Sequence, residues 1–374
     1  MTSDRSDKRH DGNRDAPHAG PDKTRPVSSR HGRNLSARGR ARRLCLPAAV
    51  LTTAALLTGA ALPAAHSAPR RPLNILLLGT DERDTITTAE KRRFHAGGEP
   101  CGCSDSMMLV HLSARRDRIS VVGLPRDSFA TVPAYRDYAG RLRRAHPVKL
   151  NAAYQEGGPE LAVKTVSAMT GVKVDKYLQV DFRRFMDTVN RVGGVEVCTP
   201  RRLKDSATKL DLRPGEHRLS GGPALQYVRS RHFDNSADLG RIQRQQRFLV
   251  QALRALSARK LLADPVRTVN WVRTLLGSGP QGFGVVELVR LASELRKVPV
   301  SSTEFTTVPI AGFNPVRRDV GSTLAWDRGK ARAVFGKLAK DQPLLVARAN
   351  PRPKDPPSLL GAPVPVRGSA YACR

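Results

Sequence analysis

Residues 103–127 read CSDSMMLVHLSARRDRISVVGLPRD, and this stretch holds two apolar runs separated by a short polar turn. The runs Met107–Leu112 and Arg118–Leu124 are rich in the residue types that favour strands. Strands joined by so short a turn pair antiparallel. Asp105, before the first strand, and Arg126, after the second, are therefore predicted to lie at the same edge of a sheet.

An upstream apolar run, Leu73–Leu78, ends at Gly79 and predicts a further buried strand. If this strand ends at the same edge, Asp81 joins Asp105 and Arg126 there. Two carboxylates and a guanidinium at one edge predict a divalent cation beside an anionic group. The alternative interpretation is that charged residues merely terminate the strands.

A second stretch, Gln226–Val250, reads QYVRSRHFDNSADLGRIQRQQRFLV and carries five arginines. Its second half predicts a helix that Ser236 or Asp238 caps and that continues with apolar residues at helical spacing. Arg241 and Gln245 are four residues apart and share one face of that helix. A helix start rich in arginine is a poor core element and a good anion site. Three of the five arginines, Arg229, Arg231 and Arg241, are predicted to form a cationic wall. The other two, Arg244 and Arg247, are predicted to be solvated surface.

The rest of the chain alternates helices and strands, which predicts an α/β (α+β) fold with a mixed central β-sheet flanked by helices. Helices are predicted over Pro159–Met169, Phe182–Val192, Asp264–Leu276, Val285–Leu295 and Gly329–Leu338. Further strands are predicted over Val172–Val180, Val195–Cys198 and Phe305–Ile310. Thr85–Gly98 is predicted to be a mobile polar loop. The main folded domain is predicted to span 73–256 and to continue over 257–348, and the Pro- and Arg-rich residues 349–374 predict a flexible tail.

The N-terminal 65 residues differ from everything that follows. Residues 1–43 are polar and basic, too poor in apolar side chains to build a core, and are predicted to be a disordered cytoplasmic leader. Residues 44–65 form 22 residues without charge, the length of a membrane-spanning helix. Basic residues before this segment place its start in the cytoplasm, which predicts a single-pass cell-membrane protein whose folded domain is extracellular. A cleaved signal peptide is the alternative, because small residues at Ala64–Ala68 suit cleavage.

The formal net charge of +31 first suggests a nucleic-acid partner. The charge is spread along the whole chain, however, and aromatic residues make up only 5% of it, so base-stacking platforms are scarce. Because the basic domain is predicted to lie outside the cell, no nucleic-acid partner is expected.

Five cysteines occur, of which Cys45 lies in the predicted membrane segment and four follow it. An even number of exported cysteines is compatible with disulfides. Cys101-Gly102-Cys103 has no His or Cys partner nearby at a zinc-binding spacing. A structural bridge from Cys198 to either Cys101 or Cys103 is the favoured pairing, and the pairing among Cys101, Cys103, Cys198 and Cys373 otherwise stays open.

Seven segments match one family in order and spacing: LLLGTDER, CSDSMMLVHL, SVVGLPRDS, KLNAAYQEGG, DFRRFMDTVNRVGGVEV, GGPALQYVRSR and DLGRIQRQQ. Together, over roughly 73–256, they resemble the LytR-CpsA-Psr family of cell-wall proteins. The resemblance implies an enzyme that moves a glycopolymer from a polyprenyl-diphosphate carrier onto peptidoglycan and forms a phosphodiester. Family members are usually signal-anchored with an extracellular catalytic domain, in agreement with the predicted topology.

The resemblance also implies site residues. Asp81 and Asp105 resemble the divalent-metal carboxylates of the family, which most often hold Mg²⁺, with Mn²⁺ as the alternative. The positions that resemble diphosphate-binding residues are Arg83, Arg126, Lys149, Arg229, Arg231, Arg241 and Gln245. Those implied to be catalytic are Arg126, Asp127, Arg229 and Arg231. Guanidinium groups suit diphosphate oxygens, and phosphoryl transfer depends mostly on positioning and charge stabilisation.

Several alternatives stay open. The acceptor hydroxyl needs a base, for which Asp127 and Asp234 are both candidates. Many family members carry an arginine where this chain has Cys103, so one cationic contact is missing, and Lys149 or Arg83 could compensate. The helices predicted at Leu161–Met169 and Phe182–Val192 line a lipid groove or simply pack in the core. The competing functions are a polyprenyl-diphosphate diphosphatase and a non-catalytic lipid-diphosphate-binding or regulatory membrane protein, similar to a transcription attenuator.

Overall fold

The computed structural model describes residues 70–99, 101–231, 237–258, 264–277, 281–345 and 364–373. The predicted leader (1–43) and membrane segment (44–65) lie outside these ranges. The chain from Ala65 onward forms one compact unit. Within the described ranges, no helix combines the length and the apolar character needed to cross a membrane.

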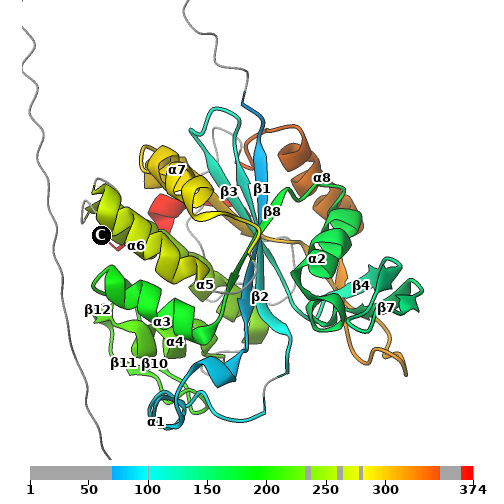
Figure 1. Ribbon diagram of the computed structural model, residues 1–374, viewed down its shortest axis with the longest axis horizontal. Helices are drawn as coiled ribbons and strands as arrows, with labels where there is room; N and C mark the ends of the chain where they lie inside the picture. Colours follow the sequence, from blue (N-terminus) through cyan, green and yellow to red (C-terminus); the bar gives the residue numbers. More distant parts are fainter. Residues whose placement is uncertain are drawn as a thin grey trace, which may run out of the picture. The chain divides into compact units, whose positions relative to one another are not determined.

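A mixed six-stranded sheet forms the centre of this unit, in the order β16-β13-β3-β2-β1-β8 (Figure 1). β2 pairs antiparallel with both β1 and β3, as the hairpin sequence predicts, and β8 and β13 add on in parallel at the two sides. The mixed central sheet is thus confirmed. The strands are β1 (Leu73–Thr80), β2 (Ser104–Leu112), β3 (Ile119–Leu124), β8 (Lys176–Val180), β13 (Thr303–Thr307) and β16 (Val366–Arg367).

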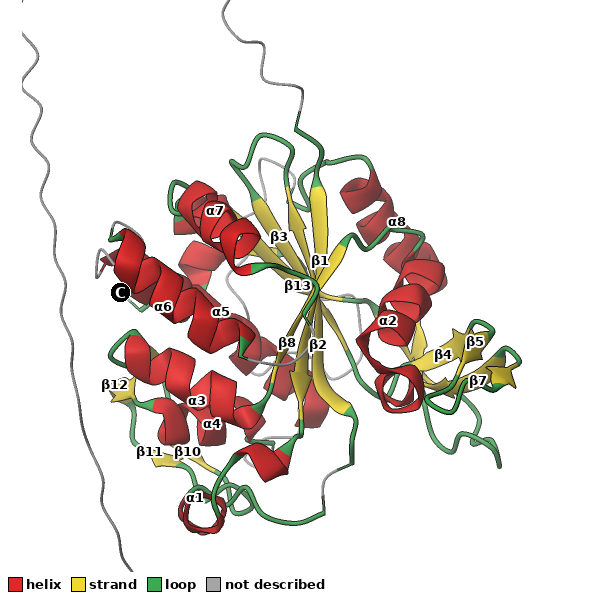
Figure 2. Ribbon diagram, viewed as in Figure 1, coloured by secondary structure: helices red, strands yellow, loops and turns green. Residues whose placement is uncertain are grey.

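Helices cover both faces of the sheet, which explains why its central strands are apolar on both sides (Figure 2). Alternate strand residues such as Leu76 and Leu109 pack under α2 (Leu150–Thr170) and α8 (Arg328–Ala339). The intervening residues face the other helical layer. That layer contains α3 (Phe182–Arg191), α5 (Ala237–Ala258), α6 (Pro265–Leu276) and α7 (Val285–Leu295).

Smaller elements frame the sheet. Two helices, α1 (Thr88–Arg93) and α4 (Gly221–Arg229), lie at the sheet edge where β1 ends. Short helical turns occupy Arg83–Thr85 (η1), Val300–Ser302 (η3) and Gly368–Ala370 (η4). Five two-stranded ribbons complete the described fold: β4 (Phe129–Val132) with β7 (His146–Lys149), β5 (Tyr135–Arg136) with β6 (Leu142–Arg143), β9 (Val195–Thr199) with β12 (Gly215–Leu219), β10 (Leu203–Lys204) with β11 (Asp211–Leu212), and β14 (Ile310–Phe313) with β15 (Leu324–Trp326).

One local prediction is wrong and another is confirmed. The segment Thr85–Gly98 is not a plain loop, because Thr87 and Glu90 form a capping box that starts α1. Helical geometry is interrupted in α2 at Gly157 and Gly158 and resumes at Pro159, so the helix predicted to begin with this proline is confirmed as the second part of α2. The first part of α2, which begins at Leu150, was not predicted.

The prediction of a flexible tail is wrong for residues 364–373. Val366 pairs with Phe305 of β13, so the chain end adds a strand to the central sheet. Cys373 is bonded to Cys198, and its carbonyl accepts a hydrogen bond of 2.8 Å from Arg254 of α5. This anchoring depends on contacts over more than a hundred residues, which composition cannot report.

The predicted disulfide pairing is also wrong. Cys101 is bonded to Cys103, and Cys198 is bonded to Cys373. The first pair closes around Gly102, whose φ of 59° lies in the left-handed region that glycine adopts without strain. Cys198 therefore finds its partner in the tail and not in the segment before β2.

A polar network ties the end of β2 to the segment after α8. Asp341 accepts a hydrogen bond of 3.0 Å from the backbone N–H of Ala114 and one of 2.7 Å from Arg118, and its carboxylate lies 3.0 Å from His111 Nε2. Burial acts to raise the pKa of Asp341, but these donors outweigh burial and lower the pKa below its ordinary value. The network holds the C-terminal segment against the sheet.

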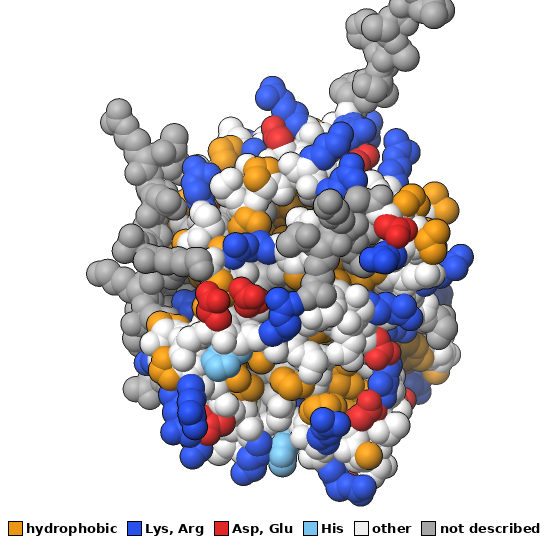
Figure 3. Space-filling model, turned by 90° about the vertical axis from the view of Figure 1, so that its left-hand side faces the viewer, with side chains coloured by type: hydrophobic (Ala, Val, Ile, Leu, Met, Phe, Trp, Pro, Cys, Tyr) orange, Lys and Arg blue, Asp and Glu red, His pale blue; other side chains and the backbone are white. Residues whose placement is uncertain are grey.

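On the face of the described chain shown in Figure 3, Lys and Arg side chains alternate with acidic and hydrophobic ones and make no continuous stripe. This face therefore lacks a concentrated basic surface of the kind that nucleic acids bind.

Candidate metal and diphosphate site

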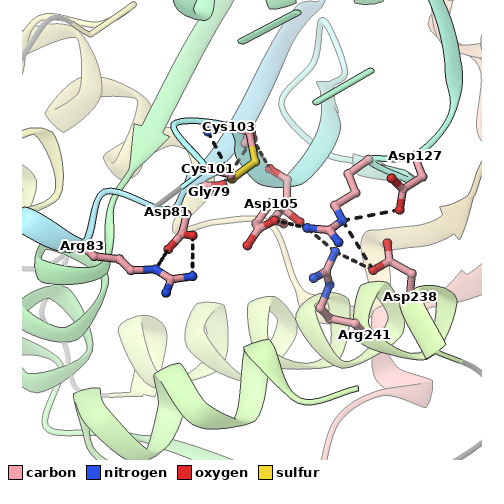
Figure 4. Close-up of a disulfide and its surroundings, with 12 residues drawn as sticks. Gly79, Asp81, Arg83, Cys101, Cys103, Asp105, Asp127, Asp238 and Arg241 are labelled. Carbon is pink, nitrogen blue, oxygen red and sulfur yellow. Dashed lines mark hydrogen bonds and ion pairs between the residues drawn. A yellow bond between two sulfur atoms is a disulfide. The ribbon is translucent and has the colours of Figure 1, made fainter. Parts of the chain in front are cut away.

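Two carboxylates meet at the edge where β1 ends and β2 begins. Asp81, directly after β1, is only 2% exposed, and its backbone N–H donates to the carbonyl of Cys103. Arg83 grips the carboxylate of Asp81 with two hydrogen bonds of 2.6 and 2.7 Å. Asp105 of β2 lies beside Asp81, as Figure 4 shows. The predicted convergence of Asp81, Asp105 and Arg126 at one sheet edge is confirmed.

Arg126, which follows β3, joins two of the carboxylates. Its Nη1 donates to Asp105 Oδ1, and its Nε lies 3.6 Å from Asp127 Oδ2. Lys149, the last residue of β7, places its ammonium group 3.2 Å from Asp127 Oδ1. The hairpin β2–β3 and the ribbon β4–β7 thus deliver these four side chains to one place.

Arg241 enters the site from the first turns of α5 and is 3% exposed. It donates to the carbonyl of Asp105 at 3.0 Å, and it lies 2.7 Å from Asp238 Oδ1. Burial lowers the pKa of Arg241 to about 10, so the group remains a cation at neutral pH. Asp238 lies inside α5 and not at its cap, and its carboxylate also comes within 4.0 Å of Arg126 and 3.7 Å of Arg231. Ser236, the other predicted cap, lies outside the described residues.

The C-terminal end of α4 supplies two more arginines. The guanidinium of Arg229 lies 4.9 Å from the centre of the Phe182 ring and donates to the carbonyl of His95 at 3.2 Å. Burial lowers the pKa of Arg229 below its ordinary value. Arg231 lies two residues further on, beside Asp238. Gln245 is one turn beyond Arg241 and accepts a hydrogen bond of 2.8 Å from Ser106 Oγ.

Electrostatics keep Asp105 ionised. Burial acts to raise the pKa of this carboxyl, but Arg241 and Arg126 outweigh burial and lower the pKa. The site as a whole combines six cations with four carboxylates, and the cations remain in excess. An excess of positive charge around ionised carboxylates suits a cation bound together with a polyanion such as a diphosphate.

Most of these charged residues line one end of a cavity of about 710 Å³, namely Asp81, Arg83, Asp105, Arg126, Arg229, Arg231 and Arg241. Asp127, Lys149 and Asp238 lie behind this lining. The remainder of the cavity runs between the sheet and α3, α5, α6 and α7, along alternate strand residues such as Met108, Val110 and Leu112. From Asp105 to Leu112 a strand extends about 24 Å at roughly 3.4 Å per residue. The cavity therefore joins a cluster of charged side chains to a long apolar channel. The predicted helix at Phe182–Val192 lines it, whereas α2 is absent from the described lining.

A buried network behind the site holds the Arg229-Ser230-Arg231 backbone, and the sequence analysis missed it. Arg244, predicted to be solvated surface, is 5% exposed and donates to the carbonyl of Ser230. Asp205, 1% exposed, accepts from the backbone N–H of Arg231 at 2.6 Å. Helical spacing places Arg244 one turn from Arg241, but the same spacing occurs for an exposed arginine, so no sequence signal identifies this network.

Other predictions have mixed outcomes. Arg247 is half-buried over the ring of Tyr371 at 5.5 Å, so its assignment to solvated surface is wrong. Asp234, one candidate base, lies outside the described residues. Cys103 is bonded and 4% exposed, and it contributes only its backbone carbonyl to the site. The roles assigned to the individual site residues stay predictions.

A mixed sheet between helical layers, with two carboxylates and a set of arginines at one mouth of an apolar cavity, defines an α/β protein whose cavity has a charged end and an apolar end. Comparison with known proteins makes the class specific. A sequence model of the LytR_cpsA_psr family matches residues 53–337, and the chain belongs to that family.

Individual relatives share part of the chain. It is 33% identical over 281 residues to the probable cell wall biosynthesis protein LcpB of Corynebacterium glutamicum, covering 74% of this chain and 64% of that protein. It is 31% identical over 199 residues to the polyisoprenyl-teichoic acid–peptidoglycan teichoic acid transferase TagV of Bacillus subtilis, covering 52% and 46%. The chain thus spans about half to two-thirds of the length of these curated relatives.

Solved structures share the fold. The crystal structure of B. subtilis TagV superposes with a TM-score of 0.56 at 23% identity, covering 73% of this chain and 97% of that one. The LytR-Csp2A-Psr enzyme from Actinomyces oris superposes with a TM-score of 0.52 at 23% identity, covering 71% and 89%. The mixed sheet flanked by helices is therefore an architecture of this family.

Proposed function

We propose that this protein is a phosphotransferase that moves a glycopolymer from a polyprenyl-diphosphate carrier to peptidoglycan, forming a phosphodiester. The observation that carries the proposal is the continuity of one cavity from a cluster of carboxylates and arginines into an apolar channel. A diphosphate with a long apolar tail has the same two-part chemistry. The names of the relatives, which include a teichoic acid–peptidoglycan transferase, support it.

The proposed metal is Mg²⁺, with Mn²⁺ as the alternative, and Asp81 and Asp105 would hold it. The donor set fits, because both carboxylates line the charged mouth and Asp105 is kept ionised. Mg²⁺ prefers oxygen ligands and is often bound through one or two carboxylates together with substrate phosphates. When bound, the ion would neutralise charge on the diphosphate. Arg83 would orient Asp81 through its two hydrogen bonds to the Asp81 carboxylate.

The arginines bind and orient the diphosphate in this proposal. Arg126, Arg229, Arg231 and Arg241 converge on the mouth from three different elements, and guanidinium groups match phosphate oxygens in geometry. Gln245 lines the same mouth, and Lys149 approaches it through Asp127. Fixed cations that meet developing charge are the principal means by which proteins accelerate phosphoryl transfer.

The reaction needs one proton transfer. The acceptor hydroxyl oxygen attacks the phosphorus that carries the glycopolymer, the bond from that phosphorus to the bridging oxygen breaks, and the lipid monophosphate leaves. Asp127 takes the hydroxyl proton in our proposal, because its carboxylate is 33% exposed beside Arg126, which lines the mouth. Each of the other three carboxylates described at the site is less exposed: Asp81 is paired with Arg83, Asp105 with Arg126, and Asp238 with the buried Arg241.

Membrane attachment and an extracellular catalytic domain belong to the same proposal. The uncharged residues 44–65 and the basic residues before them support both. A single-pass anchor would keep the apolar channel close to a lipid-linked donor that resides in the bilayer.

Transfer can be measured with the full chain in detergent, a short-chain polyprenyl-diphosphate glycan, peptidoglycan and Mg²⁺. The proposal expects radiolabelled glycan to become attached to peptidoglycan, and it expects Asp105→Asn and Arg229→Ala to abolish attachment. Arg202→Ala, at an exposed ion pair with Asp211, is the control and should retain attachment. Release of soluble phosphate without attachment would identify a diphosphatase, and binding without either product would identify a non-catalytic binder.

The channel has a test of its own. Val110→Phe narrows the channel, so the KM for a long-chain donor should rise several-fold and the KM for a short-chain donor should change little. Val286→Phe is the matched control, since Val286 is 83% exposed and lies on the outside of α7. Equal effects on the two donors would argue against a lipid chain in the channel.

A further inference from the structure

A second, polar cavity of about 470 Å³ lies between α1, α3 and α4. It shares no lining residue with the diphosphate cavity, because the two use opposite faces of the same helices. On α3, Arg183, Asp187 and Asn190 follow helical spacing on the outer face. On the inner face, Phe185 and Val189 line the apolar channel. We call the polar cavity the α1–α4 pocket.

One wall of the α1–α4 pocket is aromatic and rigidly placed. Phe94, the residue that ends α1, is half-buried and lines the pocket. Its ring packs directly on Gly222 of α4, since a Cβ atom at Gly222 would lie only 2.0 Å from the ring. The glycine therefore allows the ring to rest on the first turn of α4. The part of the ring that lines the pocket, beside the guanidinium of Arg93 that lies over it, gives the pocket an apolar surface that a sugar ring can contact.

The remaining wall offers hydrogen-bonding groups of both kinds. Asn190 accepts from the backbone N–H of Gly221 through its Oδ1, which leaves its amide nitrogen for a ligand. Gln226 donates to the carbonyl of Thr208, which leaves its amide oxygen. Ser220 is exposed, and its side chain makes no capping bond within the described helix. These are neutral donors and acceptors.

The charges in the α1–α4 pocket balance. Arg183 forms an ion pair with Glu90, and Asp187 lies 3.7 Å from the same guanidinium. Arg93 lies over the Phe94 ring at 5.3 Å and adds the second cation. Two cations and two carboxylates give the lining of the pocket no net formal charge that would attract an ionic ligand. A neutral, hydroxyl-rich ligand that also presents an apolar ring face fits this set of groups, and a carbohydrate has that chemistry.

Helix α4 connects the α1–α4 pocket to the charged end of the first cavity. α4 begins in the pocket and ends at Arg229, about 12 Å away at roughly 1.5 Å per residue. Arg229 also donates to the carbonyl of His95, the residue after Phe94. A span of about 12 Å corresponds to a few sugar residues between a ligand in this pocket and the diphosphate.

From this placement we infer that the α1–α4 pocket is a glycan subsite that holds the sugar chain of one substrate while the diphosphate lies among the arginines. The inference rests on the proposed function for the identity of the substrates and not for the existence of the site. The glycan could come from the peptidoglycan acceptor or from the donor, and both have the same neutral sugar chemistry.

Two variants test the subsite in the full chain in detergent. Asn190→Asp keeps the oxygen that accepts from Gly221 and removes the free amide donor. Phe94→Leu keeps apolar volume and removes the ring. Arg191→Ala, at the next, exposed position of α3 and outside the pocket, is the matched control. The acceptor is uncrosslinked linear peptidoglycan glycan strands, and the donor is a short-chain polyprenyl-diphosphate glycan.

A KM for glycan strands that rises about 5- to 20-fold in both variants, with kcat within twofold, supports an acceptor subsite. The same rise in the donor KM supports a donor subsite. Unchanged KM values for both substrates overturn the inference.

Saturation-transfer NMR with glycan strands alone separates this inference from the proposed function, because it needs no turnover. Binding by the wild type that both variants weaken supports the subsite even if no transfer occurs. Equal signals from wild type, variants and the Arg191→Ala control overturn it.

Discussion

Arg244 provides the sharpest test of how the site is built. Its guanidinium is buried and donates to the carbonyl of Ser230, the residue between two site arginines. Ser230 is itself fully buried, so no solvent can replace a lost donor at that carbonyl. Arg244→Met preserves much of the side-chain length and removes this charged hydrogen bond.

The magnitude follows from the desolvation of the Ser230 carbonyl. A hydrogen bond from a charged group contributes about 1.5–3 kcal/mol to stability, and a buried acceptor left without a donor costs a similar amount. If the Arg229-Ser230-Arg231 backbone shifts in response, that energy is lost from binding of the transition state. Since about 1.4 kcal/mol corresponds to a factor of ten, kcat/KM should fall roughly 10- to 100-fold.

The assay measures glycan attachment to peptidoglycan at several donor concentrations, together with thermal unfolding of each variant. Arg247→Met is the matched control, because it removes an arginine one turn further along α5 whose ring contact is with Tyr371. Arg244→Lys should recover part of the activity, since an ammonium group can still donate. A kcat/KM of Arg244→Met within twofold of the wild type, measured on folded protein, would refute the reasoning.

Three other substitutions probe packing, pH dependence and the mouth of the site. Gly123→Ala places a methyl group 2.4 Å from a side-chain carbon of Ile242 and should lower the free energy of unfolding by about 1–3 kcal/mol in chemical denaturation, whereas an unchanged midpoint would contradict this packing. The pKa of Asp341 is lowered in the folded state, so its stabilisation is present above about pH 4 and lost as the pH falls through the folded pKa. Asp341→Asn should therefore lower the melting temperature at pH 7 and have a smaller effect at an acidic pH below the folded pKa of Asp341, and equal effects at both would count against it. Replacing Cys101 and Cys103 together by serine frees the segment whose carbonyl, that of Cys103, accepts a hydrogen bond from the Asp81 N–H. The Mg²⁺ concentration for half-maximal transfer should therefore rise severalfold, while the melting temperature changes little. An unchanged Mg²⁺ requirement would argue against this role of the disulfide.

The sequence predicts well which charged residues meet at the sheet edge of Asp81, Asp105 and Arg126, because the relevant contacts are local. A short turn forces β2 and β3 to pair antiparallel, so Asp105 and Arg126 must meet whatever the rest of the chain does. The apolar run before Asp81 similarly predicts a strand that ends at this edge. These inferences need only strand pairing and the alternation of side chains.

Other features escape the sequence because they depend on distant segments. Burial of Arg244 requires a carbonyl supplied by the end of α4, and anchoring of Asp205 requires the N–H of Arg231, 26 residues away. Arginine on a helix surface and arginine beneath a loop have the same periodicity. Without the tertiary contacts, Arg244 is assigned to solvent.

Cysteine pairing shows the same limit. Cys198 bonds to Cys373 across 175 residues because the tail returns along β13 and α5. Composition describes that tail as rich in proline and arginine, and composition contains no information about a docking surface. Tail and disulfide support each other only after the sheet has formed.

The sequence by itself thus determined the order of the central strands around the β2–β3 turn, the family, and the carboxylates and arginines of the charged mouth. Their physical basis is short-range: strand pairing, helical spacing and residue chemistry. The tertiary structure alone decided that an apolar channel continues from that mouth, that a polar pocket lies behind α3 and α4, and that buried side chains hold the arginine backbone. Those features arise between elements that meet only when separate helices close over one sheet.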